Sequence, residues 1–209
     1  MCFSMGASFA ASGVLAVVGG ASLKVAKKDE KILAIFPIVF SIQQFLEGIQ
    51  WIYLKQGNVC QVSGYGFLFF AYAFWPLYVP LAIYIFDKAR RKILIYPLII
   101  GALVSGFFIT LFFTNTLTIT QEWRSIAYNL HAPIKAYVII AYLLAVFIPL
   151  LTSSNKFLRW FGLINIVLAI MAAYLHVETF ASVWCFFAAV SSIVFFIYLK
   201  YRPLLKKMF

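Results

Sequence analysis

The chain has 209 residues, of which 65% are hydrophobic, 19% aromatic and only 11% charged. A soluble globular domain carries roughly 25% charged residues, so this composition excludes that class and indicates an integral membrane protein. The formal net charge of +11 does not indicate nucleic-acid binding, because the basic residues gather in the links between apolar segments. The expected partner of the surface is the lipid bilayer.

Seven apolar segments follow one another, each near the roughly 20 residues with which a helix crosses a bilayer. None shows the alternation of a barrel strand. We therefore expect an all-α membrane protein, a single domain over residues 1–209 with seven transmembrane helices. The expected helices are Met5–Leu23, Ile32–Leu54, Tyr65–Phe86, Ile93–Thr114, Ile134–Thr152, Trp160–His176 and Val183–Tyr201.

The Lys and Arg residues predict the orientation of these helices. Most of the 17 basic residues lie in the links after the first, third and fifth helices and in the C-terminal tail. The links on the other side hold only Lys55, Arg124 and Lys135. By the positive-inside rule, the N-terminus is expected outside and the C-terminus in the cytoplasm.

Some local features predict further details. Pro76 and Pro80 lie in the middle of the third helix, where proline removes hydrogen bonds and produces a kink. The external link is expected to contain a short interfacial helix over Glu122–Leu130, with Trp123 and Tyr128 as aromatic anchors. Small residues are expected to form packing seams in the first and fourth helices: Gly6, Ser8, Ala10, Ser12, Gly13, Gly19, Gly20, Gly101, Ser105 and Gly106.

The second helix carries the polar residues that point to a function. Glu47 is an acidic residue inside an apolar segment, where a carboxylate is unfavourable unless it faces the protein interior. Gln43, Glu47 and Gln50 share a helix face, and Gln44 and Trp51 lie close to it. With the predicted orientation, Glu47 lies in the outer half of the membrane. We expect a ligand pocket there, formed by Gln43, Gln44, Glu47, Gln50, Trp51 and Trp184.

The same outer layer also collects the residue types that bind metals. Glu47, His131, His176, Glu178 and Cys2 are the candidate ligands. Such a set could hold Zn²⁺ or another divalent metal with a position left for water, which is the geometry of a catalytic zinc site. The spacing is not that of an HExxH motif. The two histidines could instead be axial ligands of a haem.

Several functions therefore remain open. The leading interpretation is an outward-facing pocket that binds or passes a cation, a metal ion or a small solute. The alternative is a membrane-embedded zinc-dependent hydrolase that uses the same residues, and a bis-histidine haem protein is a third possibility. A purely structural role for Glu47, hydrogen-bonded to its glutamine neighbours, also fits. No lysine lies mid-span in the seventh helix, so a retinal Schiff base is not expected.

The three cysteines, Cys2, Cys60 and Cys185, are too few for a disulfide scaffold. All three are expected on the outer side, where one pair could close, and Cys185 is expected to be buried and unpaired.

Three stretches carry a resemblance to a known family. The opening Met1-Cys2-Phe3-Ser4 with Ala7-Ser8-Phe9, the stretch Gln43-Gln44-Phe45 with Glu47-Gly48 and Trp51, and the block Ser182–Ala189 resemble a family of uncharacterised bacterial membrane proteins. Its members begin MCFS-x-x-ASF and carry QQ-x-x-EG-x-x-W in the second helix. The resemblance implies a multi-pass protein of the bacterial inner membrane. It also implies that Cys2, Gln44, Glu47, Trp51, Trp184 and Cys185 are positions to test.

Overall fold

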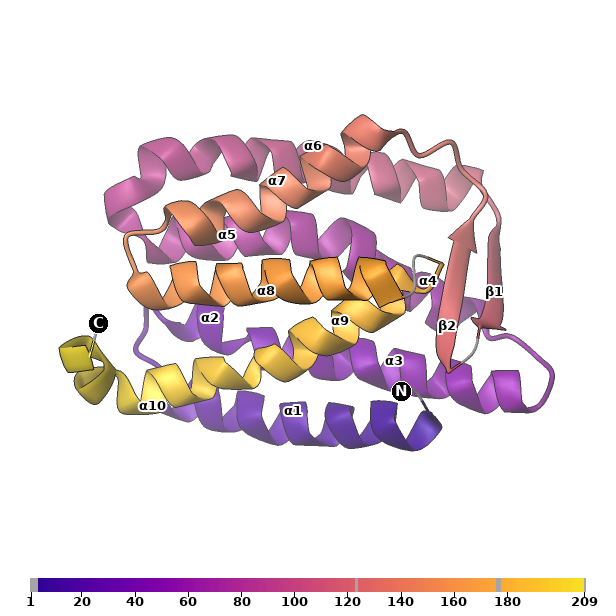
Figure 1. Ribbon diagram of the computed structural model, residues 1–209, viewed down its shortest axis with the longest axis horizontal. Helices are drawn as coiled ribbons and strands as arrows, with labels where there is room; N and C mark the ends of the chain where they lie inside the picture. Colours follow the sequence, from indigo (N-terminus) through magenta and orange to yellow (C-terminus); the bar gives the residue numbers. More distant parts are fainter. Residues whose placement is uncertain (1–3, 123, 176–177, 209) are drawn as a thin grey trace.

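The chain forms a bundle of long helices that run side by side, with a small β-hairpin across one end (Figure 1). The computed structural model describes residues 4–122, 124–175 and 178–208. Its elements are α1 (Met5–Val25), α2 (Lys31–Ala34), α3 (Phe36–Lys55), α4 (Gln61–Leu68), the π-helix η1 (Phe69–Phe74), α5 (Trp75–Phe86), the 3₁₀-helix η2 (Lys88–Arg90), α6 (Arg91–Thr114), β1 (Leu117–Glu122), β2 (Ser125–Leu130), α7 (Ala136–Thr152), α8 (Lys156–Leu175), α9 (Phe180–Ser191) and α10 (Ile193–Met208).

The helices match the predicted apolar segments, and the protein is a helical multi-pass membrane protein. Six stretches of the described chain are long and apolar enough to cross a membrane, and the 17-residue α7 is a shorter apolar helix. Three of the predicted spans are built from consecutive elements: α2 with α3, α4 with η1 and α5, and α9 with α10. α1 begins at the hairpin end and α10 ends at the opposite end (Figure 1).

The β-hairpin corrects one prediction. Glu122–Leu130 was expected to form an interfacial helix, but it contains β2, which pairs antiparallel with β1. The reason lies in the preceding residues, because Leu117 and Ile119 alternate with polar threonines and bury one face of β1. Tyr128 was expected to be an interfacial anchor, but it is buried and stacks on Phe67 at 4.6 Å. Trp123, the other expected anchor, lies outside the described residues.

The third membrane segment changes its helical form in the middle. The π-helix η1 leads into Pro76, and the N–H of Trp75 bonds to the carbonyl of Phe70. The carbonyl of Ala71 therefore lacks a backbone donor, because the next N–H position belongs to a proline. The Tyr142 hydroxyl of α7 donates to this carbonyl at 2.7 Å. The predicted irregularity is thus a π-turn that α7 stabilises.

The expected packing seams are only partly present. A Cβ at Gly101 would lie 1.9 Å from the Pro76 carbonyl oxygen, and one at Gly19 would lie 2.3 Å from Cγ1 of Ile38. These two glycines therefore permit close approach of α6 to α5 and of α1 to α3. Gly13, Gly20 and Gly106 have nothing within 4 Å of such a Cβ, so they are not contact points among the described residues.

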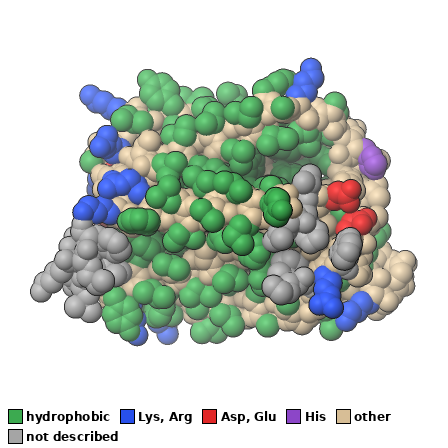
Figure 2. All heavy atoms as spheres, viewed as in Figure 1, with side chains coloured by type: hydrophobic (Ala, Val, Ile, Leu, Met, Phe, Trp, Pro, Cys, Tyr) green, Lys and Arg blue, Asp and Glu red, His purple; other side chains and the backbone are tan. Residues whose placement is uncertain are grey.

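The end opposite the hairpin carries most of the Lys and Arg side chains on the visible face (Figure 2). Two carboxylates connect the links at this end. Asp87 accepts hydrogen bonds from Ser153 Oγ at 2.9 Å and from the Ser154 N–H at 2.6 Å. Burial raises the pKa of Asp87, but the hydrogen bonds from Ser154 and Ser153 outweigh it, so the pKa lies below its usual value.

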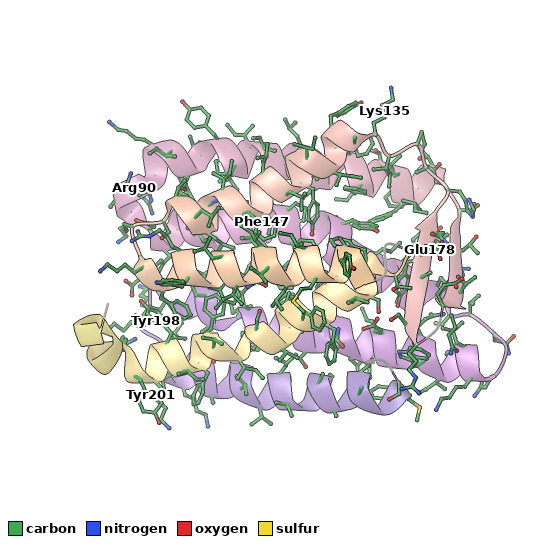
Figure 3. The ribbon with its side chains drawn as sticks, in the orientation of Figure 1. Arg90, Lys135, Phe147, Glu178, Tyr198 and Tyr201 are labelled. Carbon is green, nitrogen blue, oxygen red and sulfur yellow. The ribbon has the colours of Figure 1, made fainter. Side chains whose placement is uncertain are left out.

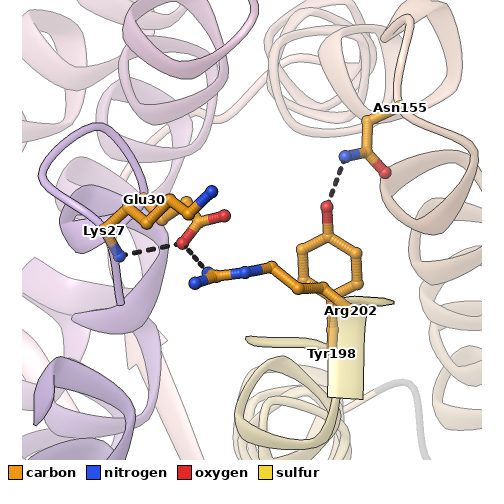
Figure 4. A network of polar contacts seen from close by, with 5 residues as sticks. All are labelled: Lys27, Glu30, Asn155, Tyr198 and Arg202. Atoms are coloured by element: carbon orange, nitrogen blue, oxygen red, sulfur yellow. Dashed lines mark hydrogen bonds and ion pairs between the residues drawn. The ribbon is translucent and has the colours of Figure 1, made fainter. Parts of the chain in front are cut away.

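The second carboxylate is Glu30, which forms an ion pair with Arg202 of α10 (Figure 4). It also accepts from the Lys27 N–H at 2.9 Å. Nearby, Asn155 Nδ2 donates to the Tyr198 hydroxyl at 2.7 Å. These contacts attach α10 to the α1–α2 link and to the start of α8.

Candidate functional site

The α3 helix has its polar face inside the bundle and its apolar face outside. Gln43, Gln44, Glu47 and Gln50 each have 0% exposure, whereas Phe45 on the opposite side is 50% exposed. In a membrane the outer surface meets lipid, so polar side chains gather where other helices cover them. The predicted shared face is therefore buried as a unit, and Trp51 is buried beside it.

Glu47 is held from two helices. Ser182, in the first turn of α9, donates its hydroxyl to Oε1 of Glu47. Gln44, one turn back along α3, donates its Nε2 to Oε2 at 3.2 Å. A carboxylate has about four lone-pair sites, so two donors leave it further accepting capacity.

The neighbouring glutamines are each fixed at one end. Trp75 Nε1 donates to Gln43 Oε1 at 2.8 Å, and Ser63 Oγ donates to Gln50 Oε1 at 2.7 Å. An indole N–H is only a donor, so the contact with Trp75 assigns the Gln43 oxygen to that side. The Gln43 amide nitrogen consequently faces away as a free donor.

Seven polar atoms of α3, the hairpin and the start of α9 are buried and have no hydrogen-bond partner among the described residues. Four are N–H donors, two are hydroxyls and one is a carbonyl oxygen. The atoms are Gln43 Nε2, Gln44 Oε1, Gln50 Nε2, Trp51 Nε1, Tyr128 OH, Thr179 Oγ1 and Trp184 Nε1. Together with Glu47 and Ser182, these residues are named the polar cluster below. Its free hydrogen-bonding capacity is mainly donor capacity.

The β-hairpin covers the polar cluster at the end of the bundle. Leu117, Ile119 and Tyr128 are its buried contacts, and Gly64 lets it approach, since a Cβ there would lie 2.3 Å from Ile119 Cδ1. Burial raises the pKa of the Tyr128 hydroxyl well above its usual value, and the charge of Glu47 adds to this rise. The Tyr128 side chain of the hairpin is therefore near enough to Glu47 to be influenced by its charge.

A cavity of about 440 Å³ adjoins the polar cluster from the side of α7, α8 and α9. Trp184 and Cys185 line it, and the Gln43 side chain lies against the Cys185 thiol. A smaller cavity of about 50 Å³ lies nearby and shares Tyr142, Trp184 and Cys185 with the first. Phe147, which lines the smaller cavity, lies between α7 and α8 (Figure 3).

The predicted metal ligands lie in different surroundings. Glu47 is fully buried, whereas His131 and Glu178 are exposed at the hairpin end, where Figure 3 labels Glu178. His131 Nε2 forms a hydrogen bond with Thr118 Oγ1 at 2.7 Å. Cys2 and His176 lie outside the described residues. Within residues 4–122, 124–175 and 178–208, no three His, Cys, Asp or Glu side chains form a group that could hold a metal ion.

Of the cysteines in the described part of the chain, Cys60 and Cys185 are both free thiols. Cys185 is buried, as predicted, and Cys60 is partly exposed. Hydrogen bonds from Ser63 lower the pKa of the Cys60 thiol. A bridge between these two cysteines is therefore not formed.

Sequence reasoning missed several members of the site. Trp75, Ser63 and Thr179 were not among the predicted residues. Ser182 appeared only within the stretch that carries the family resemblance. These residues come from other segments than α3, and their single polar groups give no periodic signal. The one available clue was a serine two residues before the Trp184-Cys185 pair.

The model of a family described as "Family of unknown function (DUF6629)" matches residues 1–208. No curated protein and no solved structure matches the chain.

Proposed function

Because the chain belongs to the DUF6629 family, whose function is unknown, we propose its function from the site alone: it binds a small oxygen-bearing molecule at the polar cluster. The binding place is the border between the polar cluster and the cavity at Trp184 and Cys185. Glu47 and Gln43 are the central contacts.

The observation that supports this proposal is the group of seven buried polar atoms without partners. Each buried unpaired donor or acceptor costs roughly 1–3 kcal/mol relative to a paired one. A bundle that served only as a scaffold would do better with apolar residues at these positions. A ligand that supplies the missing hydrogen-bond partners would remove this energetic cost.

The kind of ligand follows from the atoms that are free. Four N–H groups and two hydroxyls can donate, while Gln44 Oε1 and the remaining lone pairs of Glu47 can accept. A bare cation needs a shell of oxygen acceptors and cannot use indole or amide N–H groups. The polar cluster is therefore better suited to a molecule with carbonyl, hydroxyl or ether oxygens than to a metal ion.

The proposal includes the placement of the protein in a membrane. The bundle lies in the bacterial inner membrane with the basic end in the cytoplasm and the hairpin end outside. The gathering of Lys and Arg side chains away from the hairpin supports this orientation (Figure 2). Glu47 then lies in the outer half of the bilayer.

Native mass spectrometry of the detergent-purified protein tests the proposal. The wild type is expected to carry a bound small molecule, and Glu47→Gln is expected to lose most of it, because the amide cannot accept as strongly as a carboxylate. Glu178→Gln is the matched control, since it removes an exposed carboxylate at the same end of the bundle. Equal occupancy in Glu47→Gln and the wild type, or no bound molecule in the wild type, would contradict the proposal.

A metal measurement on the same samples addresses the hydrolase alternative. About one equivalent of bound zinc, lost in Glu47→Ala and kept in Glu178→Gln, would show that the site holds a metal ion and not the proposed molecule.

A further inference from the structure

We infer that the ligand of the polar cluster is a single-chain amphiphile that arrives sideways from the outer leaflet, through the cavity between α7, α8 and α9. This inference rests on the proposed function of the polar cluster. It adds the chemical class of the ligand and its route.

In the part of the chain that the structure describes, the route from the aqueous side is closed. The hairpin lies across the end of the bundle, and its Leu117, Ile119 and Ile126 are 5%, 4% and 0% exposed. Phe67 stacks on Tyr128 at an interplanar angle of 10°, which fills the space between the hairpin and α4. A water-soluble molecule would have to separate these apolar contacts to reach Glu47.

Among the residues that the structure describes, the route from the bilayer is open. The cavity lining includes Ile139 of α7, which is 51% exposed, and Ala173 of α8, which is also exposed. Both belong to the apolar surface that faces lipid when the bundle is in a membrane. Figure 1 shows α7 inclined away from α8 toward the hairpin end, where both residues lie. The mouth is therefore at the level of the outer leaflet.

The lining of the cavity is mainly apolar. Phe108, Leu143 and Phe180 are apolar and suit a hydrocarbon chain. The volume of about 440 Å³ falls in the range of roughly 300–1,000 Å³ that is usual for ligand pockets. Such a lining does not suit a fully polar solute.

Trp184 connects the cavity to the polar cluster. It lines the cavity, it is 8% exposed, and its Nε1 has no hydrogen-bond partner among the described residues. Cys185 next to it lies against Gln43, whose Nε2 is a second free donor. An oxygen-bearing head group at these donors and a chain in the cavity would satisfy both halves of the site.

Photo-cross-linking with stearic acid that carries a diazirine on its chain tests the inference. The full-length protein in lipid nanodiscs is irradiated with the probe, and the modified residues are mapped by mass spectrometry. Cross-links are expected on the cavity lining, above all at Leu143, Phe180 and Trp184. An even distribution over the lipid-facing helices, or no cross-link in the cavity, would overturn the inference.

Two controls make the test specific. Ala173→Phe fills the mouth and is expected to reduce the cavity cross-links severalfold, whereas Ala102→Phe adds the same side chain on the exposed face of α6 and should leave them unchanged. Unlabelled stearic acid should compete with the probe, and octadecane, which lacks oxygen, should not. Equal competition by octadecane, or no effect of Ala173→Phe, would overturn the inference.

The two proposals fail in different ways. A bound molecule that depends on Glu47 in native mass spectrometry, together with no cavity cross-links, would leave the polar cluster as a binding site and overturn only the lipid route. Cavity cross-links together with a bound molecule that ignores Glu47→Gln would overturn the proposed function of the polar cluster.

Discussion

Glu47 is the buried carboxylate of the polar cluster. Measurements of helix insertion give roughly 2.5–3.5 kcal/mol for an Asp, Lys or Arg at the centre of a membrane helix. Glu47 is fully buried, and it receives hydrogen bonds from Ser182 and Gln44. Both donors belong to the protein, and the side chain has no exposed surface.

The Cys60 thiol offers a pH-dependent test outside the membrane segments. Hydrogen bonds from the side chain and the backbone of Ser63 lower its pKa, and the thiolate is the reactive form. We expect the rate of alkylation by iodoacetamide to rise with pH and to reach half its maximum at a lower pH in the wild type than in Ser63→Ala. The rate is measured against pH in a Cys2→Ser background. Because Cys185 is buried, Cys60 is then the thiol that the reagent is expected to modify.

Loss of the rate in Cys60→Ser is the control for the site of modification. Identical pH profiles for the wild type and Ser63→Ala would show that the hydrogen bond does not act on the thiol.

The sequence predicted the α3 side of the site. The spacing of Gln43, Glu47 and Gln50 predicted a common face, and the structure buries all three side chains. The sequence did not predict that Trp75 and Ser182 face them. Helical periodicity relates residues within one segment, whereas these contacts depend on how separate helices pack.

The third membrane segment shows how an irregular helix can be stable inside a membrane. Pro76 and Pro80 remove two donors from the helix, and the π-turn before them shifts the register. Tyr142 from α7 supplies a donor to the Ala71 carbonyl, and Ser105 from α6 donates to the Ala73 carbonyl at 2.5 Å. Neighbouring helices thus satisfy backbone groups that lipid cannot.

Gly101 is the contact that lets α6 lie against this segment. We expect Gly101→Ala to lower the melting temperature clearly, with a loss of about 1–3 kcal/mol, because its Cβ would lie 1.9 Å from the Pro76 carbonyl oxygen. Gly106→Ala on the same helix meets nothing within 4 Å and should leave stability unchanged or slightly higher. Thermal unfolding in detergent compares the two variants.

A similar melting temperature for Gly101→Ala and Gly106→Ala would mean that the close approach at Pro76 does not limit stability.

Hydropathy was sufficient to predict the long helices but not the elements between them. A membrane helix needs about 20 consecutive apolar residues, and such a run can be recognised directly in the sequence. The hairpin consists of two six-residue strands whose pairing is a contact between segments. Only Leu117 and Ile119 hinted at alternation, and two residues are too few to decide between a strand and a helix.

On the scale of the whole molecule, the two ends of the bundle differ in charge and in structure. Lys and Arg side chains gather at one end, and the other end carries the hairpin, His131 and Glu178 (Figures 1 and 2). The basic end is closed by the contacts of Asp87 and Glu30 between links. The cavity is lined by residues of η1, α6, α7, α8 and α9.

The proposed orientation gives a whole-cell prediction. We expect a maleimide that cannot cross membranes to label Cys60 in intact spheroplasts, because it lies at the outer end. Lys88→Cys in a Cys2→Ser, Cys60→Ser background places an exposed thiol at the basic end and should be labelled only after the membrane is opened. The reverse pattern would place the basic end outside.

The contact between Ser182 and Glu47 also has a consequence for how the protein is made. The two residues are 135 positions apart, so α3 leaves the ribosome long before α9 exists. During that interval Glu47 has Gln44 as its neighbour on the same helix but no hydroxyl from α9. The early helices must therefore enter the membrane with an incompletely satisfied carboxylate. When α9 is inserted, Ser182 supplies the missing hydrogen bond to Glu47. A nascent chain truncated before α9 should therefore be the form that quality-control proteases recognise.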